Sequence, residues 1–491
     1  MTTRLANAAL DSLPQGVSAP GHDHAALTAG ILHVGMGNFH RAHQAVYVDE
    51  AIAKCGATDW GILGSGVMPA DAQMRADLEA QDFLYSVTQE DAETAQTRVV
   101  GSMTGFLPVE KGHAPIRQAL ADPAIRIVSM TLTEGGYFID SATGRFGEDH
   151  PSIRADIARP DRPETIFGAL VAALRDRRAA GQSPFTVMCC DNLPHNGVVT
   201  RNAVLGVARA QDEALADWIA DNVAFPNGMV DRITPATTPE RRDALAARTG
   251  VQDARPVFCE PFRQWVLEDN FPQGRPPLEE VGVQFVPDVA PYEAMKIRIL
   301  NGGHALLAYP AGLMGIQSVD EAMEHPLVVG FLDKVEREEI IPAVPPVPDT
   351  SLDDYYDLIR ERFANPKVGD AVRRICFDGS NKQAKFILNT AADNLVAGRS
   401  IAGTALQNAL WCRYCVGEIE GGAPIEPNDP IWDRLTERAR AAREDPQAWL
   451  GMAEIYGATG TNAEFAGAFT DWLNALWRDG TAATLARYLE E

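Results

Sequence analysis

Three residues with complementary chemistry lie within nine positions of one another: Lys296, Asn301 and His304. The surrounding segment, residues 291–304, has a helical pattern. At about 100° per residue, Asn301 would lie about 140° and His304 about 80° around the helix from the lysine. An amine, an amide and an imidazole on one side of a helix could take a proton from an alcohol and stabilise the resulting oxyanion.

A solvated helix face is the simpler explanation for the same three residues. Two observations favour chemistry instead. Lysine is scarce in this chain, where arginine carries most of the positive charge. Lys296 also stands on an otherwise apolar helix, where a charged side chain needs a reason to be present.

A glycine turn near the N-terminus gives a second signal. Residues 31–35 form a short apolar run that ends in Gly35, Gly37 follows, and a helical pattern begins after it. A strand, tight turn and helix in this order direct backbone N–H groups toward a pyrophosphate. His40 stands where the third glycine of the motif is usual, and the Arg41 cation could supplement the backbone donors. An ordinary strand-to-helix turn shares the Gly-x-Gly pattern, so it is the order of elements that favours dinucleotide binding.

The end of the next predicted strand, residues 60–64, bears on the choice of cofactor. In NAD-binding folds an acidic residue at this point often binds the ribose. No acid follows the strand directly, and Asp71 comes a few residues late. The first cation after the strand is Arg75, which lies even farther along the chain than Asp71. No cation close to the strand end is therefore available to bind the 2′-phosphate of NADP. This pattern favours NAD over NADP.

Length and composition limit the possible classes of protein. A chain of 491 residues is long enough for two domains, and 46% apolar with 22% charged residues is typical of a soluble globular protein. A formal charge of −24 argues against nucleic acid or anionic membrane surfaces as partners. The sequence has no apolar run of about 18 residues, as a transmembrane helix requires, and no secretory signal is expected at its start.

The cysteines predict neither disulfides nor a metal site. Seven scattered cysteines favour reduced thiols and a cytoplasmic enzyme. Cys412 and Cys415 form a C-x-x-C pair in a helical stretch, but no second Cys or His pair lies nearby. They are therefore expected to be buried apolar thiols, and no metal is expected.

The order of predicted elements indicates two domains. Strand-like runs alternate with helical patterns such as 165–178 and 198–220 in the first half, which predicts a doubly wound, Rossmann-like α/β domain at 1–290. The strand-like runs are 31–35, 60–64, 126–132, 185–190 and 256–260. After residue 291 helices dominate, which predicts a mainly α-helical domain at 291–491. The predicted helices there are 294–314, 329–341, 352–363, 382–397, 401–419, 430–443, 452–456 and 462–476.

Polar clusters follow the third and fourth strand-like runs, at 131–138 and 191–197. Ligands bind at the carboxyl ends of parallel strands, although Asn and Gly are also ordinary turn residues. Asn192 is the better site candidate of the two clusters. Asn196 is expected to be the N-cap of the helix that follows.

Several segments together resemble the polyol-specific long-chain dehydrogenases, the mannitol 2-dehydrogenase family. The most specific is 225–235, Phe-Pro-Asn-Gly-Met-Val-Asp-Arg-Ile-Thr-Pro, which resembles the family signature. Residues 35–43 resemble its cofactor turn, in which His normally replaces the third glycine, and 133–137 resemble a stretch near the cofactor. The array Lys296-x4-Asn301-x2-His304 resembles its catalytic motif. The resemblance extends over nearly the whole chain, from Gly35 to at least Lys382.

The resemblance implies a zinc-independent, NAD-dependent oxidation of a sugar alcohol to a ketose, most simply D-mannitol to D-fructose. It makes Lys296 the general base, with Asn301 and His304 as oxyanion and orienting groups. It links Glu293 to proton exchange with solvent. The substrate contacts that it implies are Asn192, Asp231, Arg374 and Lys382. Its cofactor contacts are Gly35, Met36, Gly37, Asn38, Phe39, Arg41 and Glu134.

The base must be neutral to act. A free lysine has a pKa near 10.4, and desolvation beneath a nicotinamide or a nearby cation would lower it. Neutral Lys296 could then accept the proton of the C2 hydroxyl as hydride leaves C2. Asn301 and His304 would donate to the oxygen on which negative charge grows.

Other functions remain open from the sequence. A keto-uronate such as fructuronate is the nearest, because Arg374, Lys382 or His43 could bind its carboxylate. Arabinitol and sorbitol are further candidates, whereas a sugar phosphate would need more basic residues. An NAD-binding regulator without turnover would leave the Lys/Asn/His array unexplained, and a helical scaffold would need no glycine turn. A monomer is expected.

Overall fold

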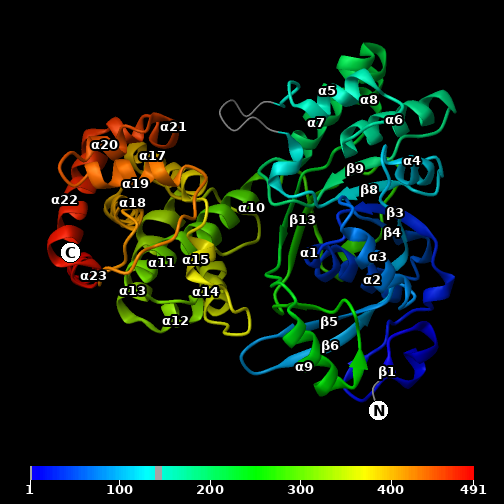
Figure 1. Cartoon of the computed structure of the whole chain (residues 1–491), viewed down its shortest axis with the longest axis horizontal. Coiled ribbons are helices and arrows are strands. Elements are labelled where there is room, and N and C mark those ends of the chain that lie inside the picture. Colours follow the sequence, from blue (N-terminus) through cyan, green and yellow to red (C-terminus); the bar gives the residue numbers. More distant parts are fainter. Residues whose placement is uncertain (1–2, 139–145) are drawn as a thin grey trace. The chain divides into compact units, whose positions relative to one another are not determined.

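The computed structural model describes residues 3–138 and 146–491 and divides the chain into two compact units, Met1–Ala290 and Pro291–Glu491 (Figure 1). Among the residues that are described, the first unit contains all the sheets and the second consists of helices and their connections. The predicted fold class, a Rossmann-like α/β domain followed by a mainly α-helical one, is confirmed.

A five-stranded parallel sheet forms the centre of the first unit. Its order is β7-β4-β3-β8-β9, and all neighbouring strands are parallel. The strands are β3 (Ala29–Val34), β4 (Gly61–Ser65), β7 (Met103–Leu107), β8 (Ile127–Met130) and β9 (Thr186–Cys189). The first of these strands in the chain, β3, lies in the middle, and the direction of winding reverses between β3 and β8. Ligands bind at the carboxyl side of such a reversal.

Both faces of this sheet are buried, which explains why its strands are apolar runs. Ile31 and Ile127 pack in one apolar cluster, together with α2 (Gln44–Cys55). Their neighbours Leu32 and Val128 pack in a second cluster on the opposite face. The second cluster includes residues of α4 (Ala114–Leu120), α6 (Ile166–Ala179), α7 (Asn196–Gln211) and α8 (Glu213–Asn222). Successive side chains of each strand point to opposite faces, so the sheet packs against helices on both sides.

One of the five predicted strands lies in a different sheet, and one strand of the parallel sheet, β7, was not predicted. Residues 256–260 form β12 (Val257–Cys259), which pairs with β5 in a separate four-stranded sheet, β12-β5-β6-β2. The parallel sheet is instead completed by β7. Its Gly105 fits tightly against Leu63, whose Cδ1 would lie 3.1 Å from an added Cβ. A glycine weakens the strand pattern in a sequence.

Further short strands and helices complete the first unit. The remaining strands are β1 (Thr3–Arg4), β2 (Val17–Ser18), β5 (Tyr85–Glu90), β6 (Ala95–Val100), β10 (Gly228–Asp231), β11 (Val251–Gln252), β13 (Gln264–Glu268) and β14 (Gln284–Val286). The remaining helices are α1 (Asn38–Ala42), α3 (Asp71–Glu79), α5 (Pro151–Ala158) and α9 (Pro239–Thr249). The predicted helix 198–220 is two helices, because Asp212 leaves the helical conformation and its side chain accepts hydrogen bonds from Ala214 N and Leu215 N at the start of α8.

The second unit packs around two buried helices, α11 (Gly302–Leu313) and α18 (Ala402–Tyr414). In the described residues 291–491 there is no strand, only isolated bridges such as Ser318 to Ala371. The other helices are α10 (Ala290–Met295), α12 (Val319–Glu324), α13 (Pro326–Val335), α14 (Leu352–Phe363), α15 (Val372–Ile375), α16 (Gly379–Gln383), α17 (Asn389–Ala397), α19 (Trp432–Ala441), α20 (Gln447–Leu450), α21 (Ala453–Tyr456), α22 (Ala463–Asp479) and α23 (Thr481–Glu490).

Three of the predicted helices contain a π-helical turn. These turns are Lys296–Asn301, Glu336–Ile340 and Ala384–Leu388, and the first packs against both of the others. π-Helical turns are rare and are frequent at functional sites. The first contains two of the three residues singled out by their chemistry.

The cysteines are all free thiols, and Cys412 and Cys415 are buried, as expected. Burial raises the pKa of both thiols well above its usual range. No group of three His, Cys, Asp or Glu side chains suited to a metal occurs among the residues that the structure describes. In the same part of the chain, no helix has the length and apolar character needed to cross a membrane.

Candidate active site

The glycine turn after β3 is fixed by contacts that only a glycine permits. Gly35 has φ +99°, and a Cβ there would lie 2.0 Å from the carbonyl oxygen of Thr131 at the end of β8. The Thr131 hydroxyl donates to Gly35 O at 2.5 Å, and Gly35 N donates to Ser65 O at 2.9 Å at the end of β4. The turn is therefore bound to both neighbouring strands at the point where the winding reverses.

Gly37 is a glycine for a different reason. Its φ of −70° is open to any residue, and no described atom lies within 4 Å of where its Cβ would be. It precedes α1, whose first N–H groups have no partner within the helix. Neither its backbone nor its protein neighbours require a glycine here, whereas a pyrophosphate that approaches the backbone closely would. The turn therefore fits a dinucleotide.

The structure buries two of the predicted cofactor contacts. Met36 is 3% exposed and its side chain packs against Gly64, so that side chain is not available to a ligand. Arg41 is 2% exposed. Its guanidinium donates to Asn38 Oδ1 at 2.7 Å and to the carbonyl oxygen of Arg255. Instead of supplementing the donors of the turn with its charge, Arg41 holds the Asn38 side chain in place.

Histidines fill the space around the turn. The His33 and His40 rings stack with centroids 3.4 Å apart, and His33 Nδ1 lies 2.8 Å from Ser129 Oγ. Phe39 stacks on His43 at 4.9 Å. Burial lowers the pKa of both His33 and His43 to about 3, and that of His40 well below its usual range. These rings are therefore neutral at physiological pH, so they add no charge beside the turn.

Asp71 reaches the end of the second strand despite its late position in the sequence. Its Oδ2 accepts hydrogen bonds from Val67 N and Met68 N, both at 2.8 Å. Gly66 permits this return, because a Cβ there would lie 2.4 Å from the Asp71 Cβ. Arg75, the first cation after the strand, donates to Phe106 O at 2.9 Å. The loop after β4 thus holds a carboxylate at the place where NAD-binding folds often use an acidic residue to bind the ribose.

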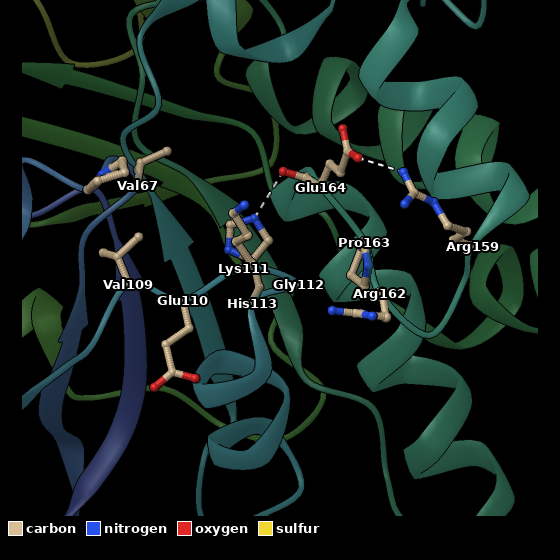
Figure 2. Close-up of a pocket in the computed structure, with 11 residues that line it drawn as sticks. Val67, Val109, Glu110, Lys111, Gly112, His113, Arg159, Arg162, Pro163 and Glu164 are labelled. Atoms are coloured by element: carbon tan, nitrogen blue, oxygen red, sulfur yellow. Dashed lines mark hydrogen bonds and ion pairs between the residues drawn. The ribbon is translucent and has the colours of Figure 1, made fainter.

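A pocket of about 540 Å³ adjoins this loop (Figure 2). Val67 and Pro69 after β4, residues 109–113 after β7, and the segment before α6 surround it. Figure 2 shows Arg159 paired with Glu164, whose backbone oxygen lies 3.2 Å from His113 Nε2. Its place beside the Asp71 loop is where the adenosine end of a dinucleotide would lie.

The loops after β8 and β9 are joined by Asp191. Its carboxylate accepts from Leu132 N at 2.7 Å, Thr133 N at 3.0 Å and the Tyr137 hydroxyl at 2.5 Å. Glu134 lies in the loop held this way, and its side chain is outside the described ones. Asp191 belongs to the predicted polar cluster 191–197 but was not among the predicted site residues, although its position directly after a buried strand was a usable signal.

The residues after β9 differ in part from expectation. Asn192 is exposed, which leaves it accessible to a ligand. Asn196 is not the N-cap, a position that His195 takes. The buried Asn196 side chain donates to Gly228 O at 2.7 Å and accepts from Gly228 N at 2.9 Å, so it ties this loop to β10. Asp231, at the end of β10, is 5% exposed.

In the second unit, a π-helical turn changes the spacing of the three chemical residues. Lys296 begins the turn and Asn301 ends it. π-Helical hydrogen bonds join residues i and i+5. The two side chains therefore point in more similar directions around the helix axis than they would in the regular α-helix assumed from the sequence. Lys296 is 7% exposed, and Glu293, one turn earlier, is also 7% exposed.

His304 lies on the next turn, against helix α14. Its ring stacks on Phe363 with centroids 4.1 Å apart. The preceding Gly303 allows the close approach, since a Cβ there would lie 3.3 Å from the Phe363 ring and 3.0 Å from Glu336 Oε1. Phe363 and Glu336 were not singled out from the sequence, where nothing marks them as neighbours of the motif.

Charged residues from a distant part of the sequence surround His304. Burial lowers the pKa of His304 to about 4; Asp370 opposes this shift, and Arg374, Arg362 and Lys382 add to it. The structure therefore brings the predicted substrate contacts Arg374 and Lys382 into the neighbourhood of His304. Lys382 Nζ donates to Ile375 O at 3.3 Å, and burial lowers its pKa.

Comparison with known proteins identifies the family. The sequence matches the models of the mannitol dehydrogenase Rossmann domain over residues 29–280 and of the mannitol dehydrogenase C-terminal domain over residues 288–477. The chain belongs to the mannitol dehydrogenase family. The resemblance found in the sequence is thereby confirmed.

Individual family members are similar over almost their whole length. The chain is 57% identical over 477 residues to mannitol 2-dehydrogenase of Cereibacter sphaeroides, covering 97% of this chain and 100% of that protein. It is 40% identical to mannitol 2-dehydrogenase of Pyrenophora tritici-repentis, covering 99% and 86%.

Two solved structures are also similar. One is Pseudomonas fluorescens mannitol 2-dehydrogenase in a ternary complex with NAD and D-mannitol, with 41% identity, a TM-score of 0.89 and coverage of 100% of both chains. The other is a D-sorbitol dehydrogenase in substrate-free form, with 38% identity, a TM-score of 0.90 and coverage of 99% of this chain and 100% of that one.

The two glycines of the turn should respond differently to alanine. Gly35→Ala forces a side chain into a positive-φ position 2.0 Å from a backbone oxygen, so the thermal unfolding temperature should fall. Gly37→Ala meets open space and should unfold like the wild type, but bind NADH about tenfold or more weakly. Thermal unfolding and a fluorescence titration with NADH measure the two effects. Normal NADH affinity in folded Gly37→Ala would contradict the assignment of the open side to the cofactor.

Acid should destabilise the protein through its buried histidines. Unfolded histidines take up protons below about pH 6.5, whereas His33 and His43 in the folded state do so only near pH 3. The unfolded state therefore binds more protons in this window, and the free energy of unfolding decreases as the pH falls through it. Urea unfolding at pH 7 and at pH 5 should show this decrease. His43→Gln should make it smaller, and an equal pH dependence in this variant would refute the explanation.

Proposed function

We propose that this chain is an NAD-dependent polyol dehydrogenase that oxidises D-mannitol at C2 to D-fructose and catalyses the reverse reduction. The observation that carries the proposal is its similarity, over the full length of both chains, to a mannitol 2-dehydrogenase solved with NAD and D-mannitol. The Lys296, Asn301 and His304 array, which is placed on a π-helical turn and the turn after it, supplies a chemistry that fits this reaction.

The first unit holds the features that fit NAD. The open side of Gly37 and the N-terminus of α1 suit the pyrophosphate, and the Asp71 carboxylate suits the adenosine ribose. The pocket beside the Asp71 loop then receives the adenosine end. When bound, the nicotinamide supplies the hydride acceptor. We assign the first unit, residues 1–290, to cofactor binding and the second, residues 291–491, to catalysis.

Lys296 is the proposed general base. Lys296 is 7% exposed, so its amine is largely shielded from solvent. The amine takes the proton of the C2 hydroxyl as the C2–H bond breaks. Glu293 lies one helical turn before it and is the candidate for passing this proton to solvent.

Asn301 and His304 are the proposed donors to the substrate oxygen. With a pKa of about 4, His304 is neutral at physiological pH and retains one N–H to donate. The Asn301 amide provides a second N–H. Losing one such donor typically costs about 2.7–4 kcal/mol of activation free energy. Because an amine and two donors perform these roles, the scheme requires no metal.

The remaining hydroxyls of the polyol need further polar groups. In the first unit, we assign substrate contacts to the exposed Asn192 and to Asp231 at the end of β10. In the second unit, we assign them to Arg374 and Lys382, which belong to the charged surroundings of His304. All four can form hydrogen bonds with hydroxyl groups without recognising a charge.

D-Sorbitol is the second candidate substrate, because a D-sorbitol dehydrogenase is nearly as similar in sequence and equally similar in structure. Sorbitol and mannitol differ only in configuration at C2, so both would give the same ketose on oxidation there. The seven free thiols favour a cytoplasmic location, and a monomer is proposed.

A substrate panel tests the proposed activity. NADH oxidation at neutral pH should be fastest with D-fructose in a set that includes tagatose, xylulose and fructuronate, with mannitol and sorbitol compared in the direction of NAD reduction. NADPH should serve much less well, because the Asp71 carboxylate repels a 2′-phosphate. A preference for fructuronate would move the chain to keto-uronate reduction. NADH binding without turnover of any substrate would favour a regulator.

Lys296→Met should remove catalysis while keeping the fold. The variant keeps a long apolar chain but has no base, so kcat should fall by about a hundredfold or more. NADH affinity should stay near that of the wild type, because the cofactor features lie in the first unit. Lys385→Met, which changes an exposed lysine on another π-helical turn of the second unit, is the matched control and should keep its activity. Wild-type turnover by Lys296→Met would exclude Lys296 as the base.

A further inference from the structure

Arg374 and Asp370 form a two-point ion pair close to His304. Arg374 Nε donates to Asp370 Oδ1 at 2.5 Å, and Arg374 Nη2 donates to Asp370 Oδ2. This is the fork geometry in which an arginine binds a carboxylate most strongly. The N–H groups of Nη1 are left for other acceptors, such as a hydroxyl group.

The carboxylate is the fixed partner in this pair. The Asp370 side chain is 6% exposed, whereas that of Arg374 is 66% exposed. The backbone around Asp370 is held by Val319 N donating to Asp370 O and by Val372 N donating to Gln317 O, both at 2.9 Å. Asp370 therefore stays in place, and the guanidinium is positioned by it.

This pair determines which substrates can use the arginine. A keto-uronate differs from a ketose by a carboxylate, and a bidentate arginine is the group that best recognises it. In this chain the fork is already occupied by a carboxylate. An incoming anion would have to displace Asp370 from the guanidinium and would then lie near an unpaired, buried negative charge.

We propose that Asp370 is a specificity-determining residue that restricts this site to uncharged polyols and ketoses by occupying the carboxylate-binding fork of Arg374. The inference rests on the proposed function, because it concerns the substrate of the same site. Arg374 then contacts substrate hydroxyls through its remaining N–H groups. The three cations whose charges act on His304 (Arg362, Arg374 and Lys382) would otherwise favour an anionic substrate.

The neighbouring Arg373 provides a natural comparison. It pairs with Glu426 Oε2 at 3.2 Å and donates to the carbonyl oxygens of Glu426 and Pro427. Arg374 is among the cations that lower the pKa of His304. Glu426→Gln would remove this carboxylate from Arg373, whose backbone acceptors stay in place, and it would leave the neighbouring Asp370–Arg374 pair intact.

Asp370→Asn tests the proposal, because it keeps the shape of the side chain and removes its charge. The ratio of kcat/KM for D-fructuronate to kcat/KM for D-fructose, with NADH, should rise about tenfold or more over the wild type. Glu426→Gln should leave this ratio unchanged. Adding Arg374→Gln to Asp370→Asn should abolish the gain. An unchanged ratio in folded, active Asp370→Asn, or a gain that persists in the double variant, would overturn the proposal.

Inhibition provides a second test that does not depend on Asp370→Asn folding. In an otherwise wild-type protein, Arg374→Gln should weaken inhibition by D-gluconate no more than it raises the KM for mannitol, because the fork is not available to either ligand. A selective loss of gluconate inhibition would show that Arg374 already binds carboxylates and would reject the proposal. If the wild type turned over neither mannitol nor fructose, the proposed function itself would fail, which is a separate result.

Discussion

The close approach of Gly35 to Thr131 is the contact on which the first unit depends. It joins the ends of β3 and β8, the two strands between which the sheet reverses its direction of winding. Hydrogen bonds from the Thr131 hydroxyl and to Ser65 O then fix the turn against three strands. A side chain at this position would separate the strands. Because these contacts with the strand ends hold the turn at Gly35, the backbone of Gly37 can remain open to a ligand.

Several buried groups around the turn have roles that the resemblance alone did not distinguish. Arg41 and Asn38 bind one another, and the neutral rings of His33 and His40 stack. Burial keeps these rings uncharged, so the donors available to a phosphate at this turn come from the backbone. The segment after Gly37 therefore supports the turn, while the ligand contacts come from the backbone.

In the second unit, geometry again decides what the residue types can do. In a regular α-helix the Lys296 and Asn301 side chains would point in different directions around the helix axis. The π-helical turn reduces the angle between them. The glycines that follow allow α11 to approach Phe363 and Glu336, and this packing orients His304. The Asp370 carboxylate then pairs with Arg374 and offsets its positive charge near His304. A motif for proton removal thus depends on neighbours up to tens of residues away in the sequence.

Much of the fold was readable from local patterns. Four of the parallel strands are continuous apolar runs because both of their faces are buried, and helix 352–363 was predicted with its observed limits. The errors have physical causes. β7 contains a glycine required by packing, and β12 pairs with a hairpin that carries no strong pattern of its own. A single π-helical turn inserted in an α-helix is too short to change the apolar periodicity of the sequence, so no pattern predicted these turns.

The sequence by itself determined the family, the fold class and the identity of the reactive groups, because motif spacing and residue type are local properties. Only the tertiary structure decided which of those groups are available to a ligand. Asp71 reaches the strand end because Gly66 lets the chain return, Arg41 is buried, and Asn196 bridges to β10 instead of capping a helix. The pairing of Arg374 with Asp370 beside His304 likewise arises from packing between distant segments. Burial and long-range pairing are set by the whole fold, and no local pattern encodes them.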